Sequence, residues 1–118
     1  MSVNASIMRW DARRSVTAAA LAAPLIAVGG PFTVQPRIIK FVNDTDQNVD
    51  VSVIGLAGNE VDIIPAYSMA VYDLTANTSH QAGYLVFNEG TQIYANAPVA
   101  PTVGSGSFYV VILYASEF

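Results

Sequence analysis

From residue 36 onward the sequence is a succession of short apolar segments separated by clusters of turn-forming residues. Residues 49–53 alternate Val with Asp or Ser, the period-two pattern of a strand with one buried face. Residues 108–114 are continuously apolar, which is typical of a strand buried on both faces. About seven or eight such segments, with turn signals roughly every 8–12 residues, predict an all-β fold, an antiparallel β-sandwich of jelly-roll or Greek-key type. The other expected strands are 37–42, 61–64, 69–74, 84–87 and 91–95.

The length and the absence of cysteine narrow the possible classes of protein. A chain of 118 residues fits one domain and can bury a core without metal or disulfide staples. Because the chain contains no cysteine, a disulfide framework, a Cys-ligated zinc and a thiol nucleophile are excluded.

The composition is poor in charge. Charged residues make up 12% of the sequence and hydrophobic residues 53%, whereas the usual charged share is about 25%. A lone soluble domain needs polar groups on its surface, so this composition predicts either a membrane location or a surface largely covered by other chains. No segment has the length and apolar density of a membrane span, so we expect no membrane partner.

The charges are also segregated along the chain. All basic residues lie in the first 40 positions, where Asp11 is the one acid, giving +4 there and −8 in the remainder for a net charge of −4. The asymmetry suggests a basic N-terminal arm and an acidic body. Since the body has no Lys or Arg after residue 40, we expect no nucleic-acid partner. The basic residues are Arg9, Arg13, Arg14, Arg37 and Lys40.

We therefore expect two parts, an N-terminal arm of residues 1–35 and a β-sandwich domain of residues 36–118. The Ala-rich stretch before Pro24 allows three interpretations: a secretory signal, a helix from Asp11 to Ala23, or an extended arm that ends in a strand at 25–28. Pro24 interrupts the apolar run of a signal, so we favour the extended arm, with a short helical turn before its strand. Its candidate interaction residues are Arg13, Arg14, Leu21, Leu25, Ile26, Val28 and Phe32.

Residues that could support catalysis or bind metal are few. His80 is the single histidine and lies in a polar segment, so metal sites built on several histidines are excluded. Asp44, Asp46 and Asp50 have the alternate spacing of a calcium loop, but Val49 stands where glycine is needed and Gly55 where a bidentate glutamate is needed. Turn formation explains these acids better, and they remain weak calcium candidates. We expect no catalytic residues, no cofactor and no enzyme activity.

Six short segments form a recognisable pattern: AVGGPF (27–32), PRIIKFVNDTD (36–46), IPAYSM (64–69), YDLT (72–75), EGTQIY (89–94) and GSGSFYV (104–110). Together they resemble small virion structural proteins of tailed bacteriophages, over roughly residues 20–116. The resemblance implies a non-enzymatic β-sandwich present in many copies on a capsid or tail, assembled in the host cytoplasm and located in the virion. It implies the major capsid protein, other virion proteins and copies of the chain itself as partners.

The expected function is that of a capsid decoration or cement protein, which holds neighbouring capsomers together through the sandwich and the arm. A neck or tail component of the same virion is the nearest alternative. A secreted carbohydrate-binding or adhesin module is a second alternative, because six tyrosines and several acidic turns could form a sugar site.

Overall fold

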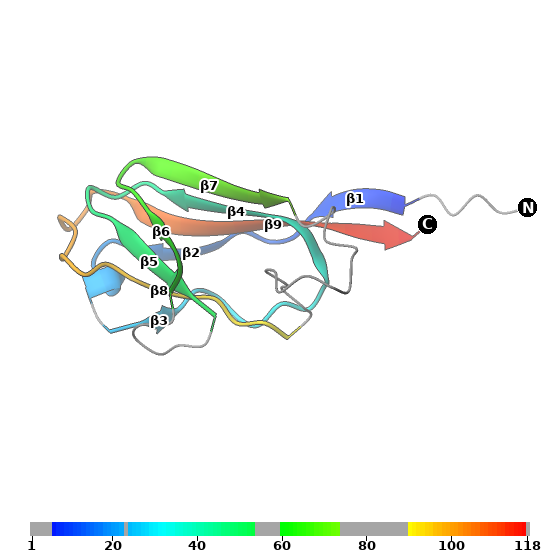
Figure 1. Ribbon diagram of the computed structural model, residues 1–118, viewed down its shortest axis with the longest axis horizontal. Coiled ribbons are helices and arrows are strands. Elements are labelled where there is room, and N and C mark those ends of the chain that lie inside the picture. The colour runs from blue at the N-terminus through cyan, green and yellow to red at the C-terminus, as the bar shows by residue number, and fades with distance from the viewer. Residues whose placement is uncertain (1–5, 23, 54–59, 74–89, 118) are drawn as a thin grey trace, which may run out of the picture.

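The computed structural model describes residues 6–22, 24–53, 60–73 and 90–117. These residues form two β-sheets that face each other (Figure 1). The strands are β1 (Ser6–Trp10), β2 (Arg14–Thr17), β3 (Ile26–Ala27), β4 (Pro36–Asn43), β5 (Val49–Ser52), β6 (Glu60–Ile64), β7 (Ser68–Asp73), β8 (Tyr94–Asn96) and β9 (Ser107–Glu117), with a 3-10 helix η1 (Ala20–Ala22).

The order of the strands is that of a jelly roll. The first sheet has the order β1-β9-β4-β7, and β2 pairs with β9 on the same side as β1. The second sheet has the order β3-β8-β5-β6. Strands β2 to β9 therefore divide into the layers 2-9-4-7 and 3-8-5-6, and all pairs are antiparallel. The expected antiparallel β-sandwich is confirmed.

The core lies between the two sheets and follows from the alternation of side chains along each strand. β4 buries Ile39 and Phe41, and β9 buries Phe108, Val110 and Ile112. The Phe41 ring stacks on Phe108, with centroids 6.1 Å apart. Burial of each such side chain stabilises the fold by about 1.5–3 kcal/mol before the entropy cost of ordering it. The second sheet contributes Val49, Val51, Ile64, Ile93 and Ala95.

Described residues before position 35 form part of the sandwich, so the structure shows no boundary at the expected residue 35. β2 pairs with β9, and β3 pairs with β8. Leu21, Val28 and Phe32, expected to contact a partner, are instead buried in the core of this chain. Backbone hydrogen bonds fix them there: the Val28 N–H donates to the Ile93 carbonyl at 2.9 Å, and the Leu21 carbonyl accepts from the Ala97 N–H at 2.9 Å.

The extended N-terminal element is β1, and it is paired with another strand rather than isolated. β1 pairs with residues 113–117 of β9, whereas β4 reaches β9 only as far as Tyr114. Residues 6–8 and 115–117 therefore form a two-stranded ribbon that projects from the sandwich (Figure 1). The alternative helix from Asp11 to Ala23 is absent, because η1 spans only Ala20–Ala22 in the described part of this segment.

Most expected strands have counterparts in the structure. The expected strands at 37–42, 49–53, 61–64, 69–74 and 108–114 correspond to β4, β5, β6, β7 and β9. The strands expected at 25–28 and 91–95 are shorter or shifted, as β3 and β8. The strand expected at 84–87 lies outside the described residues.

Candidate interaction face

The first sheet has an outer face, turned away from the core, that carries mostly apolar side chains. Side chains of residues paired across neighbouring strands lie on the same face, so the register places three rows side by side. The rows are Met69–Val42–Tyr109–Ser15, then Val71–Lys40–Val111, then Asp73–Ile38–Leu113–Trp10.

This outer face is open to solvent as far as the described residues show. Trp10 is 61% exposed, Met69 56% and Val71 54%. The charged residues in the three rows are Lys40 and Asp73, and the Lys40 ammonium lies 5.9 Å from the centre of the Trp10 ring. A mainly apolar face of this kind, with Lys40 in its middle row, is typical of interaction sites in soluble proteins.

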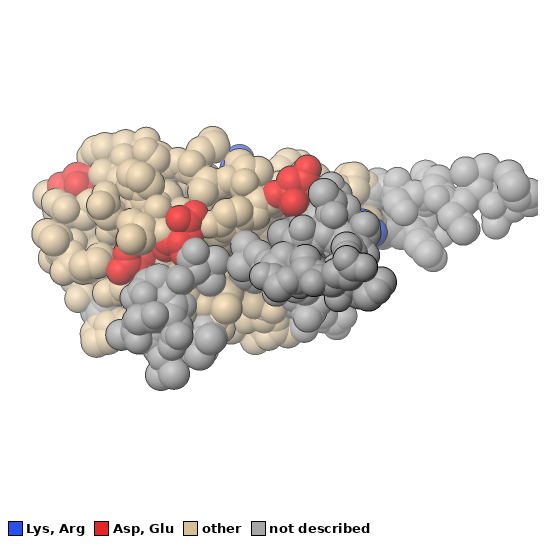
Figure 2. All heavy atoms as spheres, in the orientation of Figure 1, with Lys and Arg blue, Asp and Glu red and all other residues tan. Residues whose placement is uncertain are grey.

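The described surface seen in one view repeats the scarcity of charge in the sequence (Figure 2). In the view of Figure 2, acidic side chains lie scattered on a largely uncharged surface, and basic atoms show only at its margins. Among the described residues, the one ion pair joins Arg14 to Asp11 at 3.2 Å. The molecule therefore has few charged groups with which to attach itself to a partner.

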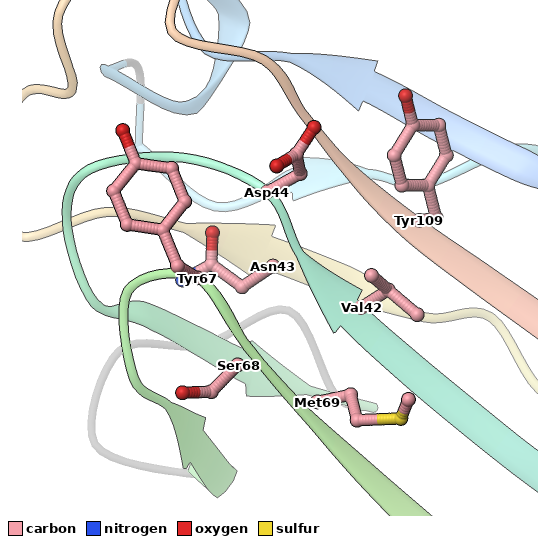
Figure 3. A pocket seen from close by; sticks show the side chains of 7 residues that line it. All are labelled: Val42, Asn43, Asp44, Tyr67, Ser68, Met69 and Tyr109. Carbon is pink, nitrogen blue, oxygen red and sulfur yellow. The ribbon is translucent and has the colours of Figure 1, made fainter.

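A hollow of about 360 Å³ opens at the Tyr109 end of the outer face. In Figure 3 the rings of Tyr67 and Tyr109 stand on its two sides with the Asp44 carboxylate between them. Aromatic, carboxylate and hydroxyl groups thus meet in one depression. Its lining residues are Val42, Asn43, Asp44, Tyr67, Ser68, Met69 and Tyr109.

A buried hydrogen-bond network forms the floor of the hollow. The Asn43 side-chain amide donates to the carbonyls of Gln47 at 2.7 Å, Ile64 at 2.9 Å and Pro65 at 3.1 Å. Its oxygen Oδ1 accepts from the Thr45 N–H at 3.0 Å and from the Thr45 hydroxyl at 2.6 Å. Asn43 therefore joins the turn between β4 and β5 to the turn between β6 and β7, and so positions the residues on the rim.

Tyr67 has an unusual backbone conformation for a bulky residue. Its φ is +54°, in the left-handed region, and its N–H donates to the Thr45 carbonyl at 3.2 Å. That conformation costs a non-glycine residue about 1–2 kcal/mol. Glycine or asparagine suits it better, and Tyr67 is 65% exposed, so burial of the ring in the core does not offset the cost.

The calcium candidates are not brought together. Asp44 lies at the hollow and Asp50 on β5. The Asp46 carboxylate accepts hydrogen bonds from the Thr102 N–H at 2.9 Å and from the Thr102 hydroxyl, and these bonds lower the pKa of Asp46. Within the described part of the chain, no three His, Asp or Glu side chains gather as a metal site would require.

The other expected interaction residues are mostly held within the chain. The Arg14 guanidinium donates to Asp11 at 3.2 Å and to the Gly30 carbonyl at 3.3 Å, and lies 5.0 Å from the Phe32 ring centre. Leu25 and Ile26 are half-buried at β3. Arg13 is exposed and lies 4.5 Å from the centre of the Tyr109 ring, beside the hollow. His80 lies outside the described residues.

Sequence reasoning missed the exposed residues of the outer face, namely Trp10, Met69 and Val71. A signal for this face was present, because the continuous apolar run at 108–114 predicted burial on both sides of that strand. In the structure one side of β9 faces the core, and the other side carries the half-buried Tyr109, Val111 and Leu113.

Comparisons of the chain with protein-family models, curated proteins and solved structures gave no match. Within the described residues no helix is long and apolar enough to cross a membrane.

Proposed function

We propose that this chain is a non-enzymatic structural protein of a phage virion, and specifically a capsid decoration or cement protein. The observation that carries the proposal is the apolar outer face of the first sheet. Residues 108–114 of β9 are apolar on both faces, and among the described residues one of these faces packs in the core.

The energetics of such a face favour a covered state. Removing apolar surface from water contributes about 25 cal/mol per Å², and the exposed side chains here include a tryptophan, a methionine and a valine. A partner that covers the face gains this free energy, and because the face carries few charged side chains, little of it is lost in removing charges from water. The attachment surface consists of Trp10, Ile38, Val71 and Leu113 with the adjoining ribbon.

Three of the described carboxylates support a structural role. Asp46 is bound by Thr102, Asp11 by Arg14, and Asp62 accepts a hydrogen bond from the Tyr72 hydroxyl. These acids are engaged in holding turns and sheets together. The jelly roll itself is compatible with capsid and lectin functions alike, so the virion context rests on the sequence resemblance.

Quantitative mass spectrometry of purified virions, produced by the genome that encodes the chain, tests the proposal. A decoration protein is present in copy numbers comparable with those of the major capsid protein. A few copies per particle would favour the neck or tail alternative, and absence from the particles would contradict a virion role.

Two matched variants test the surface. Val71→Asp places a charge on the outer face, and Val99→Asp places the same charge on an exposed loop after β8, where the valine is 61% exposed. We expect Val71→Asp to reduce incorporation into particles at least about tenfold and Val99→Asp to leave it unchanged. Equal incorporation of both variants would show that the outer face is not the attachment surface.

A further inference from the structure

The tyrosine at position 67 is not explained by the fold. Its left-handed backbone would be adopted at lower cost by glycine or asparagine. Its ring lines one side of the hollow, is largely exposed and contributes little to the core (Figure 3). Strained residues of this kind concentrate where a side chain meets a ligand.

The groups around the ring define the ligand chemistry. The Asp44 carboxylate accepts no hydrogen bond from any described residue, and it lies between two tyrosine rings. The Ser68 hydroxyl donates to the Ala66 carbonyl at 3.2 Å, which leaves its oxygen able to accept a hydrogen bond. The hollow thus combines flat apolar surface with acceptors for hydroxyl protons.

We propose that the hollow binds a neutral saccharide. A sugar ring presents an apolar C–H face, which packs against an aromatic ring, and hydroxyl groups around its edge, which donate to carboxylates and hydroxyl oxygens. Tyr67 supplies the stacking surface, and Asp44 accepts hydrogen bonds from two neighbouring hydroxyls. The volume of about 360 Å³ is at the small end of ligand sites and suits one or two sugar rings.

The local charge selects against anionic sugars. Asp44 places a negative charge in the hollow, and the nearby Arg13 is packed over the Tyr109 ring at 4.5 Å. An acidic sugar in the hollow would meet repulsion from Asp44, whereas the Arg13 guanidinium is not among the lining residues and contacts the Tyr109 ring instead. A neutral sugar avoids this cost.

The saccharide site lies at one end of the outer face and shares Val42, Met69 and Tyr109 with it. Leu113 and Trp10 lie toward the other end of the face, because Tyr109 and Leu113 are four residues apart on β9, or about 13 Å. A partner confined to the Trp10 end leaves the hollow open, whereas a partner that covers the whole face excludes the sugar. The inference does not depend on the proposed function, since it concerns the isolated chain in solution.

Saturation-transfer NMR with the full chain tests the site, using methyl glucoside, methyl galactoside, methyl mannoside and N-acetylglucosamine as neutral probes and N-acetylneuraminic acid as the anionic probe. We expect saturation transfer to the C–H face of at least one neutral probe and none to the anionic probe. Each probe is used at about 10 mM, a concentration high enough to detect millimolar binding. Absence of transfer to all four neutral probes would overturn the proposal.

Three variants separate binding from folding. Tyr67→Asn removes the ring and relieves the backbone, so it should weaken binding about tenfold while the melting temperature stays equal or rises. Tyr67→Phe keeps the ring and should bind nearly as well as the parent chain. Asp44→Asn removes the charged acceptor and should also weaken binding.

Two results would contradict this assignment. Binding that is unchanged in Tyr67→Asn would place the sugar elsewhere. A loss of particle attachment in Tyr67→Asn, together with no saccharide binding in the parent chain, would assign Tyr67 to a protein interface.

Discussion

Asn43 is the buried side chain on which the two turns at the hollow depend. It is 1% exposed and donates to carbonyls from two turns that are distant in sequence. The sequence indicated only a turn after this residue, because a cluster of Asn and Asp signals a turn without saying which side chain is buried. The role of Asn43 follows from the approach of the turn between β6 and β7, which is a tertiary contact.

We expect Asn43→Asp to destabilise the fold by about 2–4 kcal/mol. The substitution keeps the shape but replaces the amide donor by an acceptor that faces three carbonyls. Asn48→Asp is the matched control, because Asn48 is exposed and its oxygen accepts from the Ala66 N–H, a bond that aspartate retains. Urea unfolding at pH 7 measures both, and equal stability of the two variants would contradict the role of Asn43.

Tyr72, on the edge strand β7, should make the free energy of unfolding depend on pH. Burial and the neighbouring Asp62 carboxylate both raise the pKa of Tyr72. The phenol in the unfolded chain ionises near pH 10, so the stability from this group is complete below about pH 10 and is lost as pH rises further. We expect Tyr72→Phe to be about 1 kcal/mol less stable at pH 7 and to lose less stability between pH 9 and 11 than the parent chain does.

Urea unfolding at both ends of that pH range measures this effect. The matched control at pH 7 is Tyr67→Phe, which removes a hydroxyl with no hydrogen-bond partner among the described residues and should change stability by less than about 0.5 kcal/mol. An equal fall in stability above pH 10 in Tyr72→Phe and the parent chain would exclude Tyr72 as its source.

At the scale of elements, strands with a regular local pattern were predictable and strands without one were not. β5 was evident from its period of two, and β9 from its apolar run. β3 was expected as the end of an arm, because Pro24 and Gly29-Gly30 flank it closely and leave only a short apolar segment. Its pairing with residues 94–95 of β8 joins segments far apart in sequence, which no local pattern indicates. The change in charge near residue 40 was misread as a domain boundary, although charge pattern describes the surface and not the fold.

Two N-terminal deletions test how the chain is divided. Removal of residues 1–10 takes away β1, of which no described side chain belongs to the core cluster, and should leave a cooperatively folded jelly roll. Removal of residues 1–33 takes away the buried side chains of Leu21, Val28 and Phe32. Loss of each costs several kcal/mol, and the sum exceeds the free energy of unfolding of a typical domain, so this fragment should not fold. Thermal unfolding followed by circular dichroism checks both, and a folded 34–118 fragment would restore the boundary at residue 35.

At the scale of the whole molecule, the scarcity of charge determines how the chain can be held in a particle. Apolar burial is barely affected by salt, whereas exposed ion pairs contribute about 0–1 kcal/mol each and weaken as salt rises. We expect the chain to remain on purified particles after a wash in about 1 M NaCl, where the screening length is about 3 Å. Gel analysis of washed particles measures this, and complete release at moderate salt would point to attachment through the basic N-terminal residues.

The most direct test of the account is a cryo-electron microscopy reconstruction of particles that contain the chain. We expect a two-sheet domain at repeated sites on the capsid, with the outer face of the first sheet, including Trp10 and Val71, against the shell. A reconstruction that places this face toward solvent, or that shows no such domain on the particle, would contradict it.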